Sequence, residues 1–413
     1  MNTLTAKDFL TIDDFDIEDR TILVRVDLNS PMDPEGGILD DMRIHSHIPT
    51  LRDLEDAKVV LLAHQSRPGK NDFSTMEAHA RIMSGYLGRK VTYIDDIFGT
   101  YARSSISAMK KGDVILLENV RFYSEESLKR PVDEQQRTHM VRQLSPLFDI
   151  FLNDAFAVSH RSQLSIVGFT GLLPSGAGRL MEREITALNK SLQGNECPCI
   201  FVLGGAKVDD SIKVAENVLS SGGADRVLVT GVVANVMLAA SGVDIGEPNM
   251  KFIESQGYLE QIDRAKDVLE RFEGKVGLPR DAALNDNGKR IDVKIEEVAS
   301  KNLPINDIGL ETIVAYASEI ENAKTVVLNG PAGVAELDGF EIGTFEIIKA
   351  AANAGYSIAG GGHITAEVRN IGYEDQFSHI STGGGACIDF LAGDELPGIE
   401  ALKVASKRYQ ETE

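Results

Sequence analysis

The sequence predicts an α/β protein with two doubly wound parallel-sheet (Rossmann-like) domains that are joined by a helix and a hinge. Two observations lead to this prediction. Short runs of β-branched and other apolar residues recur along the chain, and each is followed by a turn with glycine or arginine and then by a helical stretch. These runs form two series, separated by one amphipathic helix. A chain of 413 residues is long enough for two or three domains.

The first series of runs indicates the strands of an N-terminal domain. A strand buried on both faces has a continuous apolar sequence, and such strands belong to parallel sheets with helical crossovers. The spacing between the runs, roughly 20–45 residues, suits strand–helix–strand units. The five runs are Thr21–Val26, Lys58–Ala63, Val91–Ile94, Val114–Leu117 and Ile150–Leu152.

A second series indicates a C-terminal domain of the same kind. Its six runs are Cys199–Leu203, Val227–Thr230, Val276–Leu278, Thr325–Leu328, Tyr356–Ala359 and His379–Ser381. Ligands of such sheets bind in the crevice beyond the C-terminal ends of the strands. The residues that follow each run are therefore the candidates for chemistry.

Between the two series, residues 179–192 carry apolar side chains at the spacing of a helix. The repeat is formed by Leu180, Met181, Ile185, Leu188 and Leu192. Gly194 stands where a glycine commonly ends a helix. We therefore expect an N-terminal domain at 1–178, a connecting helix and hinge at 179–195, and a C-terminal domain at 196–392.

The composition narrows the possible partners and compartments. The 42 Lys and Arg residues are outnumbered by 63 Asp and Glu, which gives a net charge of −21 and makes nucleic acid or an anionic membrane a poor partner. The three cysteines do not fit a disulfide framework or a zinc site. The N-terminal residues lack the apolar region of a signal peptide, and no apolar run approaches the roughly 20 residues of a membrane helix. We expect a protein of the reducing cytoplasm without a membrane partner.

Arginine gathers at the strand ends of the N-terminal domain. Residues 1–178 contain 13 Arg and 7 Lys, whereas residues 179–413 contain 9 Arg and 13 Lys. Guanidinium groups bind phosphate or carboxylate in a bidentate manner, so this bias favours a small polyanion as ligand. Pairing with surface acids would explain one arginine but not several at successive strand ends. They are Arg25, Arg67, Arg121 and Arg161, with Arg43 in a loop-like stretch after Asp40–Met42.

In the C-terminal domain, glycine follows the strand ends where the N-terminal domain has arginine. It lets backbone N–H groups approach phosphate oxygens, and a helix N-terminus that follows adds partial positive charge. Because the glycines recur after several strands, they favour a nucleotide as the ligand of this domain. The segments are Gly204–Lys207, Gly231, Asn329–Gly333, Gly360–His363 and Gly383–Gly385.

Several common enzyme motifs are absent. The sequence has no G-x-x-x-x-G-K-[ST], G-x-G-x-x-G, H-R-D, D-F-G or H-E-x-x-H, which argues against P-loop enzymes, protein kinases, simple nicotinamide dehydrogenases and zinc peptidases. His45 and His47 lack a third ligand, so we expect solvated or hydrogen-bonded histidines and no metal site made by the protein alone.

A small-anion site and a nucleotide site on separate domains suit phosphoryl transfer, which mainly requires positioning and positive charge. A carboxylate acceptor, with a pKa of about 4, also explains the lack of an obvious general base. Two alternatives stay open at this point. One is an oxidoreductase that uses a nicotinamide cofactor, and the other is a non-catalytic, two-lobed protein that binds a nucleotide and an anion.

Several of these segments resemble phosphoglycerate kinase, and the match runs in order from about residue 20 to residue 402. The resemblance implies reversible transfer of a phosphoryl group from 1,3-bisphosphoglycerate to ADP, which gives 3-phosphoglycerate and ATP in glycolysis and gluconeogenesis. It implies in-line transfer after hinge closure, Mg²⁺ bound through the nucleotide, a monomer, and a segment 393–413 that returns to the N-terminal domain. The matching segments are Arg25–Asn29, Asp40–Arg43, His64–Arg67, Leu117–Arg121, Asn153–Arg161, Gly204–Lys207, Asn329–Glu336, Ser381–Gly385 and Leu396–Gly398.

The resemblance also implies roles for single residues. Arg43 and Lys207 would be catalytic because they would contact the phosphoryl group in transfer. The residues that would hold 3-phosphoglycerate are Asp27, Leu28, Asn29, Arg43, His64, Gln65, Ser66, Arg67, Arg121 and Arg161. Those that would hold the nucleotide are Lys207, Gly231, Gly309, Asn329, Glu336, Gly361, Gly362, His363 and Ile364.

Three positions depart from the common pattern of this family. His363 stands where the family commonly has Asp, and an imidazole is a poor ligand for Mg²⁺. Ser211 replaces a second lysine, for which Lys213 is a candidate substitute. The segment His64–Arg67 reads His-Gln-Ser-Arg in place of His-Leu-Gly-Arg. The combination of His363 and Ser211 resembles the archaeal branch, and the acidic composition agrees with it.

Overall fold

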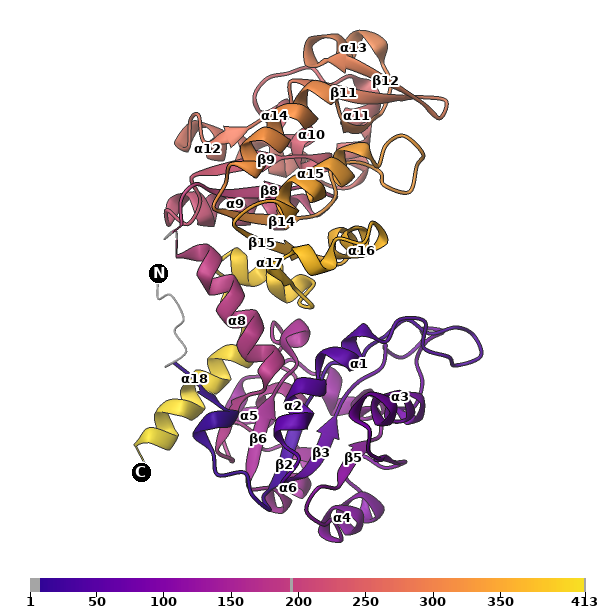
Figure 1. The fold of residues 1–413 in the computed structure, drawn as a ribbon, viewed down its shortest axis with the longest axis vertical. Coiled ribbons are helices and arrows are strands. Elements are labelled where there is room, and N and C mark those ends of the chain that lie inside the picture. The colour runs from indigo at the N-terminus through magenta and orange to yellow at the C-terminus, as the bar shows by residue number, and fades with distance from the viewer. Residues whose placement is uncertain (1–7, 194–195, 412–413) are drawn as a thin grey trace. The chain divides into compact units, whose positions relative to one another are not determined.

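The computed structural model describes residues 8–193 and 196–411 (Figure 1). These residues form two compact units, and the division between them falls within helix α8 (Arg179–Leu192), between Thr186 and Ala187. The N-terminal unit comprises residues 8–186 and 395–411, and the C-terminal unit comprises residues 187–193 and 196–394. Helix α8 has the bounds expected from the sequence, whereas Gly194, expected to end it, lies outside the described residues.

A seven-stranded parallel sheet forms the centre of the N-terminal unit, in the order β1-β7-β6-β2-β3-β5-β4. Five strands match the expected runs to within one residue. The strands β1 and β7 were not expected, because two or three residues are too few for a recognisable run. The strands are β1 (Leu10–Thr11), β2 (Thr21–Arg25), β3 (Lys58–Leu62), β4 (Val91–Ile94), β5 (Val114–Leu117), β6 (Ile150–Asn153) and β7 (Ser175–Ala177).

Both faces of this sheet are covered, which explains the continuous apolar runs. On β2, Ile22 and Val24 belong to one hydrophobic cluster, and Leu23 belongs to another on the opposite face. All three side chains are fully buried. The expectation of parallel strands buried on both faces is confirmed.

Helices and short 3-10 turns cover the two faces. They are η1 (Ile12–Asp14), α1 (Met42–Ser46), α2 (Ile48–Asp53), α3 (Glu77–Leu87), α4 (Thr100–Ser107), η2 (Val120–Phe122), η3 (Ser124–Ser127), α5 (Val132–Gln135), α6 (His139–Leu144), η4 (Ser145–Leu147), η5 (Phe156–Val158), α7 (Leu164–Val167) and α18 (Pro397–Gln410). Helix α18, yellow in Figure 1, packs on β7, α7 and β1 of this unit. The N–H of Gly398 donates to the carbonyl of Ser159 at 2.8 Å, which fixes the start of this helix.

A six-stranded parallel sheet forms the centre of the C-terminal unit, in the order β10-β9-β8-β14-β15-β16. Every strand lies within one residue of an expected run. The strands are β8 (Cys199–Leu203), β9 (Arg226–Val229), β10 (Val276–Gly277), β14 (Thr325–Asn329), β15 (Tyr356–Gly360) and β16 (His379–Ile380).

The C-terminal unit also contains a three-stranded antiparallel sheet that the sequence analysis missed. Its order is β12-β11-β13, with β11 (Asp281–Asp286), β12 (Lys289–Lys294) and β13 (Ile305–Ile308). The strand β12 is largely exposed and rich in charge, so it lacks an apolar run. The hairpin turn did carry a signal, because Asn287 and Gly288 both have positive φ, at 54° and 88°, as a type I′ turn requires.

The helices of the C-terminal unit connect these strands. They are α9 (Val208–Ser220), α10 (Gly231–Ala240), α11 (Glu247–Ser255), α12 (Leu259–Arg271), η6 (Ile295–Glu297), α13 (Val298–Lys301), α14 (Leu310–Glu321), α15 (Ile342–Ala352), α16 (Gly362–Asn370), η7 (Glu374–Gln376) and α17 (Gly385–Leu391). In the described part of the chain, no helix has the length and apolar character needed to cross a membrane.

The buried carboxylate of Asp154 joins the start of α8 to the strand ends of the N-terminal sheet. Its Oδ1 accepts a hydrogen bond from the N–H of Leu180 at 2.8 Å, and its Oδ2 accepts one from the hydroxyl of Thr50 at 2.8 Å. His47 Nδ1 lies 2.7 Å from Oδ2, and His47 Nε2 accepts from the N–H of Asp27 at 3.0 Å. The hydrogen-bonding role expected for His47 is therefore confirmed.

We expect Asp154→Ala to lower the free energy of unfolding by about 3 kcal/mol. The change removes a helix cap, and it leaves the buried side chains of Thr50 and His47 without their hydrogen-bond partner. Urea denaturation followed by circular dichroism measures the loss. The exposed Glu35→Ala is the control and should change the free energy by less than about 0.5 kcal/mol. Equal losses in the two variants would contradict the role assigned to Asp154.

Candidate active site

Charged residues meet where the strands of the N-terminal sheet end. Arg25, the last residue of β2, is fully buried, and its guanidinium lies 3.0 Å from Nδ1 of His64, which follows β3. His64 Nδ1 also lies 3.8 Å from the carboxylate of Asp27. The other oxygen of that carboxylate forms an ion pair with Arg43 of α1, whose side chain is 38% exposed. Two neighbouring strands and one helix thus bring these four residues together.

The protonation of this group follows from burial and charge. Burial alone raises the pKa of Asp27, but Arg43, followed by His64, Arg25 and a hydrogen bond from the N–H of Asn29, outweighs it and brings the pKa to about 2. Burial lowers the pKa of His64 well below its usual range, and the charges of nearby arginines add to this effect. At neutral pH the site therefore contains an ionised Asp27 and an uncharged His64.

Three further arginines lie within electrostatic range of one another at the same edge. Burial, followed by the charges of Arg161 and Arg25, brings the pKa of Arg121 to about 10. The positive charge of Arg67 lowers the pKa of both Arg121 and Arg161. We call Arg25, Arg43, Arg67, Arg121 and Arg161 the arginine cluster. Arg25 is buried, Arg67 is exposed and the other three are partly buried, so the like charges repel one another and the cluster is suited to an anionic ligand.

His160 is a member of this site that the sequence analysis quoted within a motif but did not select. Its Nε2 accepts a hydrogen bond from Nε of Arg161 at 3.2 Å. Burial and the adjacent Arg161 charge lower the pKa of His160 to about 4, so the ring is neutral at pH 7. Its position directly before Arg161 was the only signal in the sequence.

The loop after β3 is held in place by side chains that were expected to bind substrate. The amide of Gln65 is fully buried; it accepts from the N–H of Ser30 at 3.1 Å and donates to the carbonyls of Ser30 at 2.8 Å and Asp72 at 3.1 Å. Ser66 has a left-handed conformation, φ 53°, which suits glycine better than serine. Its hydroxyl donates to Asp72 at 2.5 Å, and its N–H donates to Asn29 at 2.6 Å.

The side chains of Leu28 and Gln65 are thus committed to the interior of the unit. Leu28 is part of the hydrophobic core, and only its main chain remains for a ligand. The other residues expected to bind 3-phosphoglycerate lie on the loops after β2, β3, β5 and β6 or on α1. The structure therefore brings the expected residues to one edge, with different roles for these two side chains.

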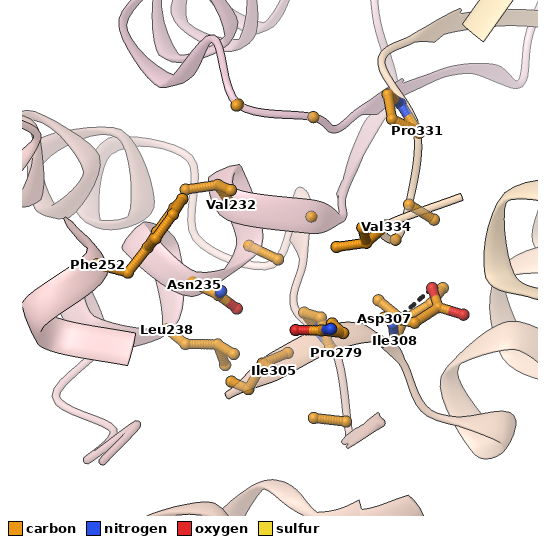
Figure 2. Close-up of a pocket in the computed structure, with 18 of the residues that line it drawn as sticks. Val232, Asn235, Leu238, Phe252, Pro279, Ile305, Asp307, Ile308, Pro331 and Val334 are labelled. Carbon is orange, nitrogen blue, oxygen red and sulfur yellow. Dashed lines mark hydrogen bonds between the residues drawn. The ribbon is translucent and has the colours of Figure 1, made fainter. Parts of the chain in front are cut away.

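The C-terminal unit contains a cavity of about 230 Å³ among the loops at its strand ends. Apolar side chains from α10, such as Val232 and Leu238, and from the segment after β14, such as Val334, face the cavity (Figure 2). Phe252 of α11 also lines it, and Asn235 adds an amide. An apolar cavity with few polar groups suits a flat aromatic ring.

Of the residues expected to bind nucleotide, Gly231, Glu336 and His363 line this cavity. Gly309 lies beside it rather than in its lining, and a Cβ there would come within 2.2 Å of the carboxylate carbon of Asp281. That carboxylate accepts hydrogen bonds from the first turn of α14, including one from the N–H of Thr312 at 2.8 Å. Gly309 therefore permits a helix cap, independently of any ligand.

The glycine loops are tied to each other by their backbones. The N–H of Gly204 donates to the carbonyl of Asn329 at 2.7 Å, and the N–H of Gly231 donates to the carbonyl of Ala332 at 3.0 Å. Gly330 has φ 83°, and a Cβ at this position would lie 2.3 Å from the carbonyl oxygen of Gly204. Close approach of the loops thus requires glycine here, apart from any contact with phosphate.

Two buried polar groups in this region have no hydrogen-bond partner among the residues described. They are Nδ2 of Asn329, which is 4% exposed, and Oγ1 of Thr230, which is fully buried. Unpaired buried polar groups are costly, and the amide of Asn329, at the end of β14, can be satisfied by a ligand or a water molecule. Sequence reasoning selected Asn329 and missed Thr230.

The N-terminus of α16 lies beside this point. Gly361 precedes the helix with φ 94°, and a Cβ there would lie 2.8 Å from the amide oxygen of Asn329. His363 is exposed and lines the cavity, whereas the side chain of Ile364 is buried in the core and leaves only its N–H for a ligand. The free N–H groups of a helix start suit phosphate.

Lys207 is exposed and occupies the N-cap position of α9, one turn before the buried Ser211. Lys213, further along α9, is also exposed, and both lysines lie within electrostatic range of Asp389 on α17. The positive charge of Lys207 at a helix start adds to the partial charge of the backbone.

Asp307 is a part of the nucleotide region that sequence reasoning missed. It lines the cavity, and its carboxylate pairs with Arg290 at 2.8 Å and accepts from the N–H of Gly343 at 2.8 Å. Burial raises its pKa to about 6, although Arg290 opposes this. Arg290 also donates to the carbonyl of Gly339 at 2.8 Å, so the pair joins the antiparallel sheet to the segment that carries Glu336.

Within the described residues, no three acidic, His or Cys side chains gather as metal ligands. At the start of α16, the side chain that lines the cavity is the imidazole of His363, which does not match the oxygen preference of Mg²⁺. These side chains fit a metal that is held mainly by a nucleotide's own phosphates.

The fold and these two regions define a class of protein, a two-unit α/β phosphotransferase. The family model of phosphoglycerate kinase matches residues 12–394. A phosphoglycerate kinase of Methanosarcina mazei is 67% identical over 411 residues, with 100% of this chain and 99% of the relative covered. One of Archaeoglobus fulgidus is 50% identical, with 95% of this chain and 96% of the relative covered.

Solved structures agree with these relatives. The crystal structure of phosphoglycerate kinase from Pyrococcus horikoshii has a TM-score of 0.88 and 42% identity, and covers 97% of this chain and 100% of that one. The structure of the Coxiella burnetii phosphoglycerate kinase has a TM-score of 0.82 and 33% identity, with 96% and 100% covered.

The chain belongs to the phosphoglycerate kinase family. It is a kinase that uses a carboxyl group as acceptor, and its fold class is confirmed. The resemblance to the archaeal branch is confirmed by the archaeal relatives. The non-catalytic alternative is not favoured.

The low pKa of Asp27 leads to a prediction about acid stability. Because its pKa falls from 3.8 to about 2 on folding, the ionised carboxylate stabilises the fold at neutral pH by about 2 kcal/mol, and this contribution is lost as pH falls from about 4 to about 2. Asp27→Asn lacks this titration. Urea unfolding of both proteins across that range should show their difference in stability shrinking by about 2 kcal/mol. A constant difference would contradict the assigned pKa; Asp263→Asn, on the surface of α12, is the control.

Proposed function

We propose that the arginine cluster of the N-terminal unit holds 3-phosphoglycerate and that the cavity of the C-terminal unit holds ADP or ATP. The observation that carries this proposal is the cluster itself, five arginines around an uncharged His64 with one buried carboxylate, Asp27, on the ligand side. The acid substrate carries a phosphate and a carboxylate, and both suit guanidinium donors. In this proposal Asp27 and Asn29 orient the substrate hydroxyl and the neighbouring loops, and Arg67, Arg121 and Arg161 neutralise its charge.

The nucleotide is assigned by the same reasoning. The base fits the apolar part of the cavity beside Gly231 and Gly309, and Glu336 accepts hydrogen bonds from the ribose hydroxyls. The phosphates lie toward Asn329 Nδ2 and the N–H groups of residues 361–364 at the start of α16. Mg²⁺, bound through the nucleotide, neutralises the phosphate charge.

Phosphoryl transfer to a carboxylate requires mainly that the protein positions the two substrates and stabilises negative charge. The acceptor carboxylate is ionised at neutral pH, so no general base is needed. Arg43 and Lys207 stabilise the charge on the transferring group. Because the two sites belong to different units, in-line transfer requires that the units close on each other and exclude water. We further propose that the protein acts as a monomer in the cytoplasm, with these small molecules as its partners.

The decisive experiment measures phosphorylation of 3-phosphoglycerate by ATP, coupled to consumption of the acyl phosphate, with Mg²⁺ and with EDTA. We expect turnover that requires Mg²⁺. Binding of the nucleotide without turnover, across a range of salt concentrations, would instead support a two-lobed binding protein.

We expect Arg43→Ala to lower kcat about 100-fold or more, since one donor to the transition state is lost. Steady-state kinetics with each substrate varied measures this. Arg52→Ala, an exposed arginine on the adjacent helix α2, is the matched control and should keep wild-type kcat. A normal kcat with only a raised KM in Arg43→Ala would remove Arg43 from the chemical step. Lys207→Ala should behave like Arg43→Ala.

Asn329→Asp tests the phosphate end of the nucleotide site. The change keeps the shape, removes the unpaired donor and adds a negative charge next to the phosphates, so KM for ATP should rise about tenfold or more. The KM for 3-phosphoglycerate should not change. Asn322→Asp, which changes an exposed amide directly after α14, serves as control. If both variants bind ATP equally well, the phosphates lie elsewhere.

A further inference from the structure

The guanidinium of Arg25 determines the protonation of His64. Arg25 is fully buried, and its Nε donates to the hydroxyl of Ser165 at 2.9 Å. One terminal nitrogen donates to the carbonyl of Val26, and the other lies 3.0 Å from Nδ1 of His64. A guanidinium has only donors, so Nδ1 of His64 has to be the acceptor and carries no proton.

His64 is consequently neutral with its proton on Nε2. This agrees with the low pKa of the ring, which burial and the charges of Arg25 and Arg121 depress, while Asp27 opposes them. No hydrogen bond joins Nε2 to any other residue within the described parts of the chain. Nε2–H is therefore a donor that is available to a ligand of the arginine cluster.

Arg25 is connected through Ser165 to a buried acid, Glu126. The carboxylate of Glu126, in the 3-10 turn η3, accepts from the hydroxyl of Ser165 at 2.7 Å and from its N–H at 3.2 Å. Glu126 and Ser165 are both fully buried, so neither can contact a substrate. A chain of hydrogen bonds thus runs from Glu126 through Ser165 and Arg25 to His64.

We propose that Glu126 and Ser165 are positioning residues for the acid substrate: they fix Arg25, and through it they hold His64 as the neutral tautomer whose Nε2–H donates to the substrate. The proposal rests on the proposed function of the N-terminal unit and adds two residues to it. Burial raises the pKa of Glu126, whereas Arg25 and the two hydrogen bonds from Ser165 oppose this rise; as a carboxylate, Glu126 balances the buried charge of Arg25, which would otherwise be costly in the interior. Ser165 sets the angle of the guanidinium because its hydroxyl oxygen accepts a hydrogen bond from Nε–H of Arg25 while its O–H donates one to Glu126.

The tautomer can be measured without substrate. Long-range ¹H–¹⁵N spectra of the ¹⁵N-labelled full-length protein at pH 7, assigned with His64→Gln, should show His64 with a protonated Nε2 and an unprotonated Nδ1. A proton on Nδ1, or on both nitrogens, would overturn the proposal. This measurement is independent of turnover, so a failure of the proposed function would leave its outcome intact.

Variants test whether Ser165 and Glu126 act on the substrate. In Ser165→Ala, KM for 3-phosphoglycerate should rise about tenfold, KM for ATP should stay unchanged, and the ¹⁵N signals of His64 should move away from the pure Nε2–H tautomer. Ser175→Ala removes another fully buried hydroxyl of the same unit, one that donates only to the carbonyl of Leu173, and serves as the matched control.

Glu126→Gln keeps an acceptor for Ser165 but removes the charge, and it should raise KM for 3-phosphoglycerate in the same direction. If Ser165→Ala and Ser175→Ala have the same kinetics and the same His64 spectrum, Ser165 is merely structural and the proposal fails. It also fails if KM for both substrates changes in parallel with the midpoint of unfolding.

Discussion

One constraint decides where this protein can do chemistry: all strands of its two large sheets run in the same direction. Both faces of each sheet are filled by apolar side chains, so polar groups collect at the edge where the strands end. In the N-terminal unit this edge receives arginines, and in the C-terminal unit it receives glycine loops and helix starts. Residues that are 39 to 140 positions apart in the sequence thereby become neighbours, as Arg25, His64 and Ser165 do.

The same constraint explains which parts of the fold could be predicted from the sequence. Burial on both faces requires uninterrupted apolar runs, and β5, β8 and α8 have the expected bounds. The antiparallel sheet could not be recognised in this way, because a strand such as β12 faces water and mixes charged with apolar residues. The turn at Asn287–Gly288 was the better signal, since its chemistry does not depend on burial.

Site residues were predictable by type and position but not by role. Arginines at strand ends indicate an anion whatever their exact contacts, and Asn329 stands at the end of a strand beside glycine. The sequence could not indicate that the amide of Gln65 is used to hold loops, because its partners Ser30 and Asp72 lie on different segments. Nor could it indicate the left-handed conformation of Ser66, where serine replaces the glycine of the common pattern and a hydrogen bond to Asp72 offsets the strain.

The hydrogen bonds of Asp154 have a mechanical consequence. The carboxylate accepts a hydrogen bond from the first turn of α8, and through His47 it is connected to the main chain of Asp27. The beginning of α8 and the loop after β2 therefore form one rigid piece. Buried polar networks whose members are all hydrogen-bonded rigidify the elements that they join. Since the division between the units falls further along α8, between Thr186 and Ala187, these hydrogen bonds fasten the N-terminal half of the helix to the N-terminal unit.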